Sequence, residues 1–179
     1  MLKTVTQAIP NYAMNIYLLP VNLCKELEIM MNSFWWGTKR NGDRGIHWRR
    51  WDSMCKPKSF GGIGFKKIRD FNIAMLGKQC WKLMTTPQSL VARILKARYY
   101  PRSILTEARV GFNPSYTWRS IMAAQHAVIQ GSRLRIGSGL QVQITKDPWL
   151  PDVDNGCITT VLDESLATAT VNCLMVPGQ

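Results

Sequence analysis

The chain has 179 residues, a formal net charge of +12 and 46% hydrophobic residues. This apolar fraction suffices for a packed core and argues against a disordered chain, while no apolar run approaches the roughly 20 residues that cross a bilayer. The five cysteines are widely spaced, without a C-x-x-C pair, so we expect reduced thiols and no metal site.

Residues 1–36 are predicted to form N-terminal helices. Their start reads as neither a secretory signal nor an Arg-rich transit peptide, so we expect an intracellular chain, in the nucleus, the mitochondrion or elsewhere. Pro10 and Pro20 interrupt the first apolar stretch and predict one broken helix or two short ones. A clearer helix follows over residues 20–36, and Gly37 is placed to end it. Its apolar residues recur at helical spacing and predict a core face: Leu23, Leu27, Met30, Met31 and Phe34.

Residues 37–69 form a basic, aromatic linker. Between residues 39 and 69 there are ten Lys or Arg and two Asp, whereas residues after 146 include five acids and no base. Such a cluster repels itself unless an anion neutralises it, and RNA or DNA does so while releasing counterions. Plain solvation, an acidic protein and a membrane surface are the alternatives. We predict phosphate contacts for eight residues: Arg49, Arg50, Lys56, Lys58, Lys66, Lys67, Lys39 and Arg40.

Trp48 and Trp51 alternate with two of these arginines and allow two interpretations. Their rings could stack on bases, as aromatic side chains do in proteins that bind single strands. Their i,i+3 spacing also suits one buried face of a turn, with the arginines outward, and we favour this second interpretation. The glycines at positions 61, 62 and 64 predict a tight bend with positive φ, because no Gly-Lys-Ser/Thr follows to make a phosphate loop.

Residues 70–131 are predicted to be a helical connector of three helices. Asp70 is a suitable N-cap for the first, whose apolar face holds Ile73, Leu76, Cys80 and Leu83. The second places Leu90, Val91, Ile94 and Leu95 on one side and ends near Pro101. After a loop over residues 102–114, Ser115 caps the third, which Gly131 closes. Its apolar side comprises Trp118, Ile121, Met122, Gln125, Val128 and Ile129.

In residues 132–151 the spacing of apolar residues changes from helical to alternating, which predicts a β-hairpin. Residues 133–136 and 140–144 alternate between apolar and polar on either side of a Gly-Ser-Gly turn. Residues 152–179 are an acidic tail with weak patterning, and we read its close acid pair, Asp152 and Asp154, as a solvated turn. The predicted fold is therefore mainly α, a helical bundle with a small C-terminal β-hairpin.

Catalytic signatures are missing from the sequence. His47 and His126 have no nucleophile or carboxylate obviously placed with them, and no Asp-Asp pair is present to bind the metal ions of a polymerase. We therefore predict no catalytic centre, no metal and no cofactor.

Short motifs spread over nearly the whole chain resemble the reverse transcriptase polyprotein of plant LINE-type (non-LTR) retrotransposons. Similar stand-alone open reading frames occur in plants, mitochondrial ones included. The motifs follow the family's order: Gln7–Met14, Leu18–Pro20, Phe34–Gly37, Ile46–Trp48, Trp51, Cys55–Lys58, Gly61–Phe65, Lys96–Pro101, Pro114–Ser120 and Asp147–Pro151.

The resemblance places this chain after the polymerase palm and implies a thumb-like segment followed by a helical connector. In the family the palm carries a Tyr-x-Asp-Asp-type motif, which this sequence lacks, and a Cys/His zinc segment and a ribonuclease H domain follow the region matched here. Cys157 and Cys173 are therefore not assigned to that zinc site.

The resemblance implies a non-catalytic fragment of an RNA-directed DNA polymerase that holds RNA or an RNA–DNA hybrid by its phosphate backbone. The alternatives are a structural or protein-interaction module, whose apolar helix faces would bind the missing palm or a second copy, and a decayed remnant without a selected role. No membrane partner is expected.

Overall fold

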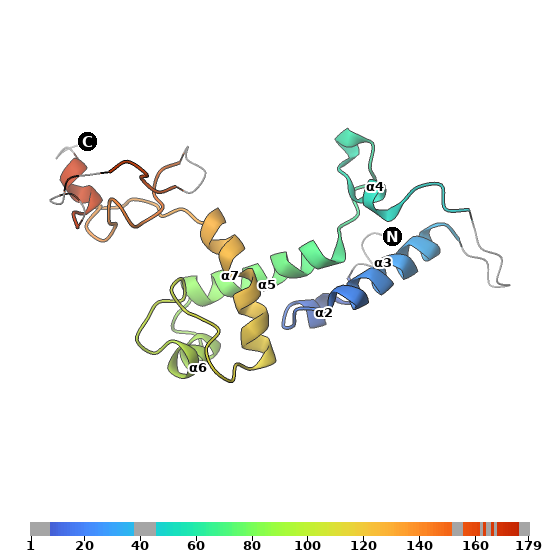
Figure 1. The fold of residues 1–179 in the computed structure, drawn as a ribbon, viewed down its shortest axis with the longest axis horizontal. Helices are drawn as coiled ribbons and strands as arrows, with labels where there is room; N and C mark the ends of the chain where they lie inside the picture. The colour runs from blue at the N-terminus through green and yellow to red at the C-terminus, as the bar shows by residue number, and fades with distance from the viewer. Residues whose placement is uncertain are drawn as a thin grey trace. The chain divides into compact units, whose positions relative to one another are not determined.

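A computed structural model describes residues 8–37, 46–151, 156–161, 163, 166 and 168–175. The chain divides into two compact units, Met1–His126 and Ala127–Gln179, which are taken separately below. Within the described residues the regular structure is helical and contains no strand, so the predicted mainly α fold is confirmed (Figure 1). The elements are α2 (Asn11–Met14), α3 (Val21–Trp35), α4 (Trp51–Cys55), η1 (Lys58–Phe60), α5 (Ile68–Thr85), α6 (Leu90–Tyr99), α7 (Tyr116–Gly131) and η2 (Val171–Leu174).

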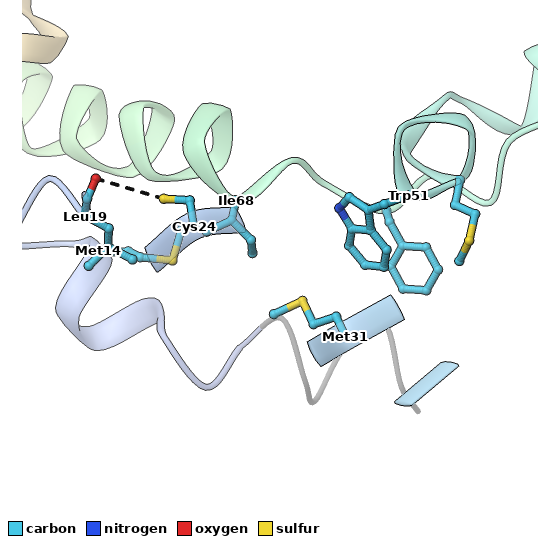
Figure 2. Close-up of a cluster of buried hydrophobic side chains, with 8 residues drawn as sticks. Met14, Leu19, Cys24, Met31, Trp51 and Ile68 are labelled. Carbon is cyan, nitrogen blue, oxygen red and sulfur yellow. Dashed lines mark hydrogen bonds between the residues drawn. The ribbon is translucent and has the colours of Figure 1, made fainter. Parts of the chain in front are cut away.

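The core of the first unit forms where α2 and α3 pack against α5 and where α4 packs against α3. Figure 2 shows the side chains that meet there, drawn from helices and from the segments between them. Removing these apolar groups from water is the main stabilising contribution to the unit. The buried members are Met14, Leu19, Cys24, Met31, Trp51, Met54, Phe65 and Ile68.

The buried face of α3 differs from the predicted one. Cys24 and Met31 are buried, whereas Leu23, Met30 and Phe34 are 40%, 57% and 62% exposed. The apolar stripe of the helix is wider than the face that α4 and α5 cover, so its period alone does not say which part of the stripe is buried. The prediction that Leu23, Met30 and Phe34 belong to the core is therefore wrong. They lie on an exposed apolar stripe beside the face that contacts α4 and α5.

A buried asparagine joins α5 to the segment between α2 and α3, here called the N-terminal junction (residues 14–19). Asn72 is fully buried on the core face of α5. Its Oδ1 accepts a hydrogen bond from the amide of Leu19 at 2.8 Å, and its Nδ2 donates to the carbonyl oxygens of Met14 at 2.8 Å and Tyr17 at 3.0 Å. One side chain thus satisfies three backbone groups that would otherwise be buried without partners.

Helix α7 holds the other side of the N-terminal junction. The amide of Leu18 donates to Ser120 Oγ at 2.9 Å, and the Tyr116 hydroxyl donates to the Leu18 carbonyl oxygen at 2.6 Å. Arg69 adds a bond from Nη1 to the Leu19 carbonyl oxygen at 2.6 Å. The junction therefore ties the N-terminal helices to both long helices of the unit.

Helix α5 begins two residues before the predicted cap. Its first residue is Ile68, and Asp70 lies within the first turn instead of capping it. The Ile68 amide donates to Glu28 Oε1 at 2.8 Å, so a carboxylate from α3 satisfies an open N–H at the positive end of the helix dipole. The predicted apolar face is otherwise correct, because Leu76 and the residues after it at positions 80 and 83 are buried.

The last two helices of the connector follow their predicted bounds closely. Ser115 caps α7 as predicted, since its Oγ accepts from the Trp118 amide at 3.2 Å, and Trp118 is fully buried. Ser89 caps α6 in the same way. On α6, three residues of the predicted apolar side face solvent: Leu90, Val91 and Ile94 are 69%, 60% and 55% exposed.

The predicted β-hairpin at 132–151 is not confirmed in the second unit. All of these residues are described, and none lies in a strand. Segment 140–144 instead bonds to the C-terminal stretch: the Val171 amide donates to the Val142 carbonyl oxygen at 2.8 Å, and the Ile144 amide to that of Ala169 at 3.1 Å. The alternating pattern thus reflects burial of Val142 and Ile144 against Val171, a pairing distant in sequence that a local hairpin rule cannot foresee.

Candidate nucleic-acid interface

The predicted binding residues that the structure describes lie on a compact loop, here called the basic turn (residues 49–67). The carbonyl oxygen of Met54 accepts hydrogen bonds from three successive amides, those of Ile63, Gly64 and Phe65, at 3.0–3.2 Å. The Gly64 amide also donates to the Lys56 carbonyl oxygen at 2.9 Å. These bonds close α4, η1 and the glycines into one unit without any strand pairing.

Glycine is required in the basic turn for two different reasons. Gly61 and Gly64 have φ of +73° and +74°, which confirms the predicted bend with positive φ. Gly62 is needed for close approach instead, because a Cβ there would lie 1.9 Å from the Lys56 carbonyl oxygen. The chain folds back on Lys56 so tightly that no side chain fits between.

Three core side chains fix the basic turn to α3. Trp51, Met54 and Phe65 are all buried, and the rings of Trp51 and Phe65 lie 4.9 Å apart. Trp35 of α3 meets Phe65 edge to face at 5.1 Å. Figure 2 shows Trp51 and Met31 of α3 in the same cluster. The loop is therefore anchored by apolar burial, and its polar residues are left on the outside.

Six predicted phosphate-binding residues are described, and all of them are exposed: Arg49, Arg50, Lys56, Lys58, Lys66 and Lys67. The other two, Lys39 and Arg40, lie outside the described residues. Among the described side chains, Arg50, Lys56 and Lys58 form no ion pair, so their charges face solvent. An exposed Lys or Arg on a fixed backbone is suited to contact phosphate.

The remaining cations already have intramolecular partners. Arg49 donates from Nη1 to the Gly61 carbonyl oxygen, which holds the start of the basic turn against its middle. The Lys67 ammonium lies 3.0 Å from an Asp52 carboxylate oxygen, and this contact raises the pKa of Lys67. The Lys66 ammonium lies 4.0 Å from the centre of the Phe71 ring, a cation–π arrangement.

A groove of about 660 Å³ runs beside the basic turn and the start of α5. It brings Lys56, Lys66 and Lys67 together, whereas Arg49, Arg50 and Lys58 are not part of its lining. Two carboxylates also line it, so its charge is mixed, and its remaining lining is mainly apolar. The lining residues are Asp52, Cys55, Lys56, Phe65, Lys66, Lys67, Asp70, Phe71 and Ala74.

The thiol in this groove is poorly suited to nucleophilic chemistry. Burial raises the pKa of Cys55 to about 11, with a smaller contribution from Glu28. Since the thiolate is the reactive form, a group with this pKa is almost entirely protonated at neutral pH. Within the described residues, no three His, Cys, Asp or Glu side chains gather to hold a metal ion.

The two tryptophans of the sequence pattern separate in the structure. Trp48 is 73% exposed, which leaves its ring accessible to a base. Trp51 is only 9% exposed and lies against Phe65, so one of its faces is covered and it belongs to the core. The favoured interpretation, in which both tryptophans are buried, is therefore correct for Trp51 and wrong for Trp48, because Trp48 precedes α4 and Trp51 is its first residue.

Sequence reasoning overlooked two residues with structural roles in this region. Asp52 restrains Lys67, and Arg69 belongs to the basic cluster by composition but bonds to the N-terminal junction. The first had a usable signal, because Asp52 is the one acid between residues 49 and 67, among six Lys or Arg. The second has no local signal, as its partner Leu19 is 50 residues away.

Comparison with known proteins gives two relatives, both from Arabidopsis thaliana. "Uncharacterized mitochondrial protein AtMg00310" is 39% identical over 146 residues, which cover 81% of this chain and 94% of that protein. "Putative ribonuclease H protein At1g65750" is 28% identical over 185 residues, covering 99% of this chain but 29% of that protein. This chain thus spans less than a third of the second relative.

The chain matches no protein-family model and no solved structure. No helix in the described part of the chain is long and apolar enough to span a membrane.

Proposed function

The chain belongs to the family of the Arabidopsis mitochondrial protein AtMg00310, and we propose that it is a retroelement-derived, non-catalytic nucleic-acid-binding module. The proposed parent is the reverse transcriptase polyprotein of LINE-type (non-LTR) retrotransposons, and the proposed ligand is RNA or an RNA–DNA hybrid. The motif resemblance supports the parent. The second relative supports it too, because it includes a counterpart of this whole chain within a much longer protein.

The exposed cations of the basic turn are the observation that carries the proposed binding. Residues 46–70 contain seven Lys or Arg and two Asp, and one of those Asp is paired with Lys67. Arg50, Lys56 and Lys58 project from a backbone that Met54 and the buried Trp51 hold in place. Because the backbone that carries them is already held, little backbone freedom is lost when these cations meet a phosphate backbone, which favours binding.

No catalytic step is assigned to the chain. The name of the second relative refers to a ribonuclease H protein, and the aligned part is 29% of that protein. The two carboxylates that line the groove have structural surroundings here: Asp52 pairs with Lys67, and Asp70 lies in the first turn of α5. The proposed role is therefore to hold nucleic acid.

The test is fluorescence anisotropy with labelled RNA, DNA and RNA–DNA hybrid of one sequence across a salt series. We expect affinity to fall steeply with salt. Replacing Arg50, Lys56 and Lys58 together by Gln should weaken binding to every ligand and reduce the salt slope by about 2–3, at about 0.7–0.9 per lost phosphate contact. The three side chains are exposed, so thermal unfolding should hardly change.

A matched variant separates a local contact from net charge. Lys25, Lys78 and Lys82 are also exposed, on α3 and α5, and their replacement by Gln removes the same number of charges. This control should keep the wild-type salt slope. Equal losses in both triple variants, or a flat salt response of the wild-type chain, would rule out the basic turn as the binding surface.

A protein-interaction module is the second candidate, favoured by the exposed apolar stripe of α3. Leu23, Met30 and Phe34 recur on one side of that helix at a spacing suited to helix pairing. The partner would be the polymerase palm or a second copy of the chain. Sedimentation velocity at rising concentration tests the second copy, and the Met30→Glu/Phe34→Glu variant should then stay monomeric where the wild-type chain associates.

A further inference from the structure

The loop between α6 and α7 is fixed at both ends and carries a fully exposed aromatic residue. Here it is called the aromatic loop (residues 102–114). The Gln125 side chain of α7 holds its first half. Its Nε2 donates its two N–H groups to three carbonyl oxygens, those of Leu105 at 2.6 Å, Ala108 at 3.1 Å and Thr106 at 3.2 Å, so that one N–H is shared. Leu105 and Ala108 are buried beneath it.

Trp118 holds the second half of the aromatic loop. Its Nε1 donates to the Val110 carbonyl oxygen at 3.2 Å. Its ring stacks on Tyr99 and Tyr100, with centroids 4.8 Å and 5.5 Å apart. The Tyr99 hydroxyl in turn accepts from the Ser115 amide at 3.0 Å. Two motifs separated in sequence, 96–101 and 114–120, therefore meet and frame the loop.

Phe112 stands at the tip of this framed loop and is fully exposed. The residues on either side have left-handed backbone, Gly111 at φ +73° and Asn113 at φ +53°. Asn tolerates this conformation better than most residues, yet it is uncommon outside glycine. A single exposed Phe needs no explanation by itself. Here the loop backbone is anchored on both sides of the ring, and the ring points away from the core.

The charges around the aromatic loop indicate what the ring would meet. Residues 93–119 contain six Lys or Arg and a single acid, Glu107. Arg102, Arg109 and Arg119 are exposed, and the Arg98 guanidinium lies over the Tyr99 ring at 5.4 Å. An apolar protein partner would leave these cations unpaired, whereas a polyanion with aromatic bases would satisfy both features.

We propose that the aromatic loop is a second nucleic-acid contact, in which Phe112 stacks on an unpaired base while Arg102 and Arg109 contact neighbouring phosphates. This inference rests on the proposed nucleic-acid function and specifies its ligand as a single-stranded segment. Stacking tolerates any base because every base has an aromatic face, so the contact would hold a strand without reading its sequence.

The test compares two strands on the full chain: a fluorescein-labelled polyuridine RNA and an abasic strand of the same length. Phe112→Ala should lose affinity for polyuridine by about 5- to 150-fold, the range for one lost stacking contact, and should keep its affinity for the abasic strand. Phe112→Trp should retain binding. Tyr12→Ala removes an exposed ring from α2, 82% exposed, and should match the wild-type chain on both strands.

The outcomes separate this inference from the proposed function. If Phe112→Ala binds polyuridine like the wild-type chain while the Arg50/Lys56/Lys58 variant does not, the aromatic loop is excluded and the basic turn stands. If Phe112→Ala loses affinity for both strands equally, stacking is refuted. If the wild-type chain binds neither strand nor the hybrid, the proposed function itself fails. Thermal unfolding of each variant should remain that of the wild-type chain, since the replaced ring touches no core residue.

Discussion

Replacing Gly62 by Ala should disrupt the basic turn more than any other glycine change in it. The added Cβ would lie 1.9 Å from the carbonyl oxygen of Lys56, 2.5 Å from its carbonyl carbon and 2.8 Å from its Cα. All three are backbone atoms, so no side-chain rotation relieves the overlap and the chain itself must move by more than an ångström. Overpacking of this kind costs about 1–3 kcal/mol, and we expect the upper end.

The assay follows unfolding by far-ultraviolet circular dichroism and binding by anisotropy. A loss of about 3 kcal/mol should lower the melting temperature of a unit this size by roughly 8–15 °C. RNA affinity should fall as well, because the displaced backbone carries Lys56 and Lys58.

Two further glycines make the comparison quantitative. Gly61→Ala meets open space but has φ +73°, which costs about 1–2 kcal/mol for a residue with a Cβ. Gly131→Ala, at the end of α7, has neither problem and should stay within about 0.5 kcal/mol of the wild-type chain. If Gly62→Ala has the same melting temperature as Gly131→Ala, the close approach at Lys56 does not exist and the prediction is refuted.

Three other predictions concern the core, an ion pair and the thiols. Asn72→Leu leaves three buried backbone groups of the N-terminal junction unpaired and should cost about 3 kcal/mol or more in urea unfolding. Asp52→Asn should bring the raised pKa of Lys67 down toward its usual 10.5, as read by NMR titration. In the wild-type chain that ion pair stabilises below pH 10.5 and is lost as pH rises through the raised pKa. Iodoacetamide at pH 8 should modify the exposed Cys173 well before Cys80, because burial raises the pKa of Cys80 to about 11.

Each of these has a result that contradicts it. For the core, Asn22→Leu on the exposed side of α3 is the control, and equal stability of the two leucine variants would show that the junction is not held by hydrogen bonds. If the pKa of Lys67 is the same in Asp52→Asn as in the wild-type chain, the ion pair between the two side chains does not exist. Equal alkylation rates at the two thiols would mean that α5 opens readily in the folded chain.

Strong local signals in the sequence predicted the elements well. The bounds of α7 follow from a serine cap, a continuous apolar stripe and a closing glycine, all within one stretch. The positive φ of Gly61 and Gly64 was equally local. These features need no knowledge of neighbouring segments, because capping and turn geometry are decided within a few residues.

Features decided by distant segments were not predictable in the same way. The side of α3 that is buried depends on where α5 lies, so Met30 and Phe34 were assigned to the core although they are exposed. The alternation over residues 140–144 was real, but its partner comes from residues 169–171. For the candidate site, composition alone identified the basic region. The intramolecular partners of Arg49 and Lys67 could be found only from the folded structure.

The hydrogen bonds between Leu18 and α7 impose an order on how the chain folds during its synthesis. Leu18 and Ser120 are 102 residues apart, so their contact is impossible until α7 has left the ribosome. At about 5–20 residues per second, the N-terminal helices would wait roughly 5–20 s for that partner. Until α5 emerges, the apolar side chains of α2 and α3 that pack against it are exposed to other nascent chains and to chaperones. Folding of the first unit therefore ends, and does not begin, with the docking of residue Leu18 onto α7.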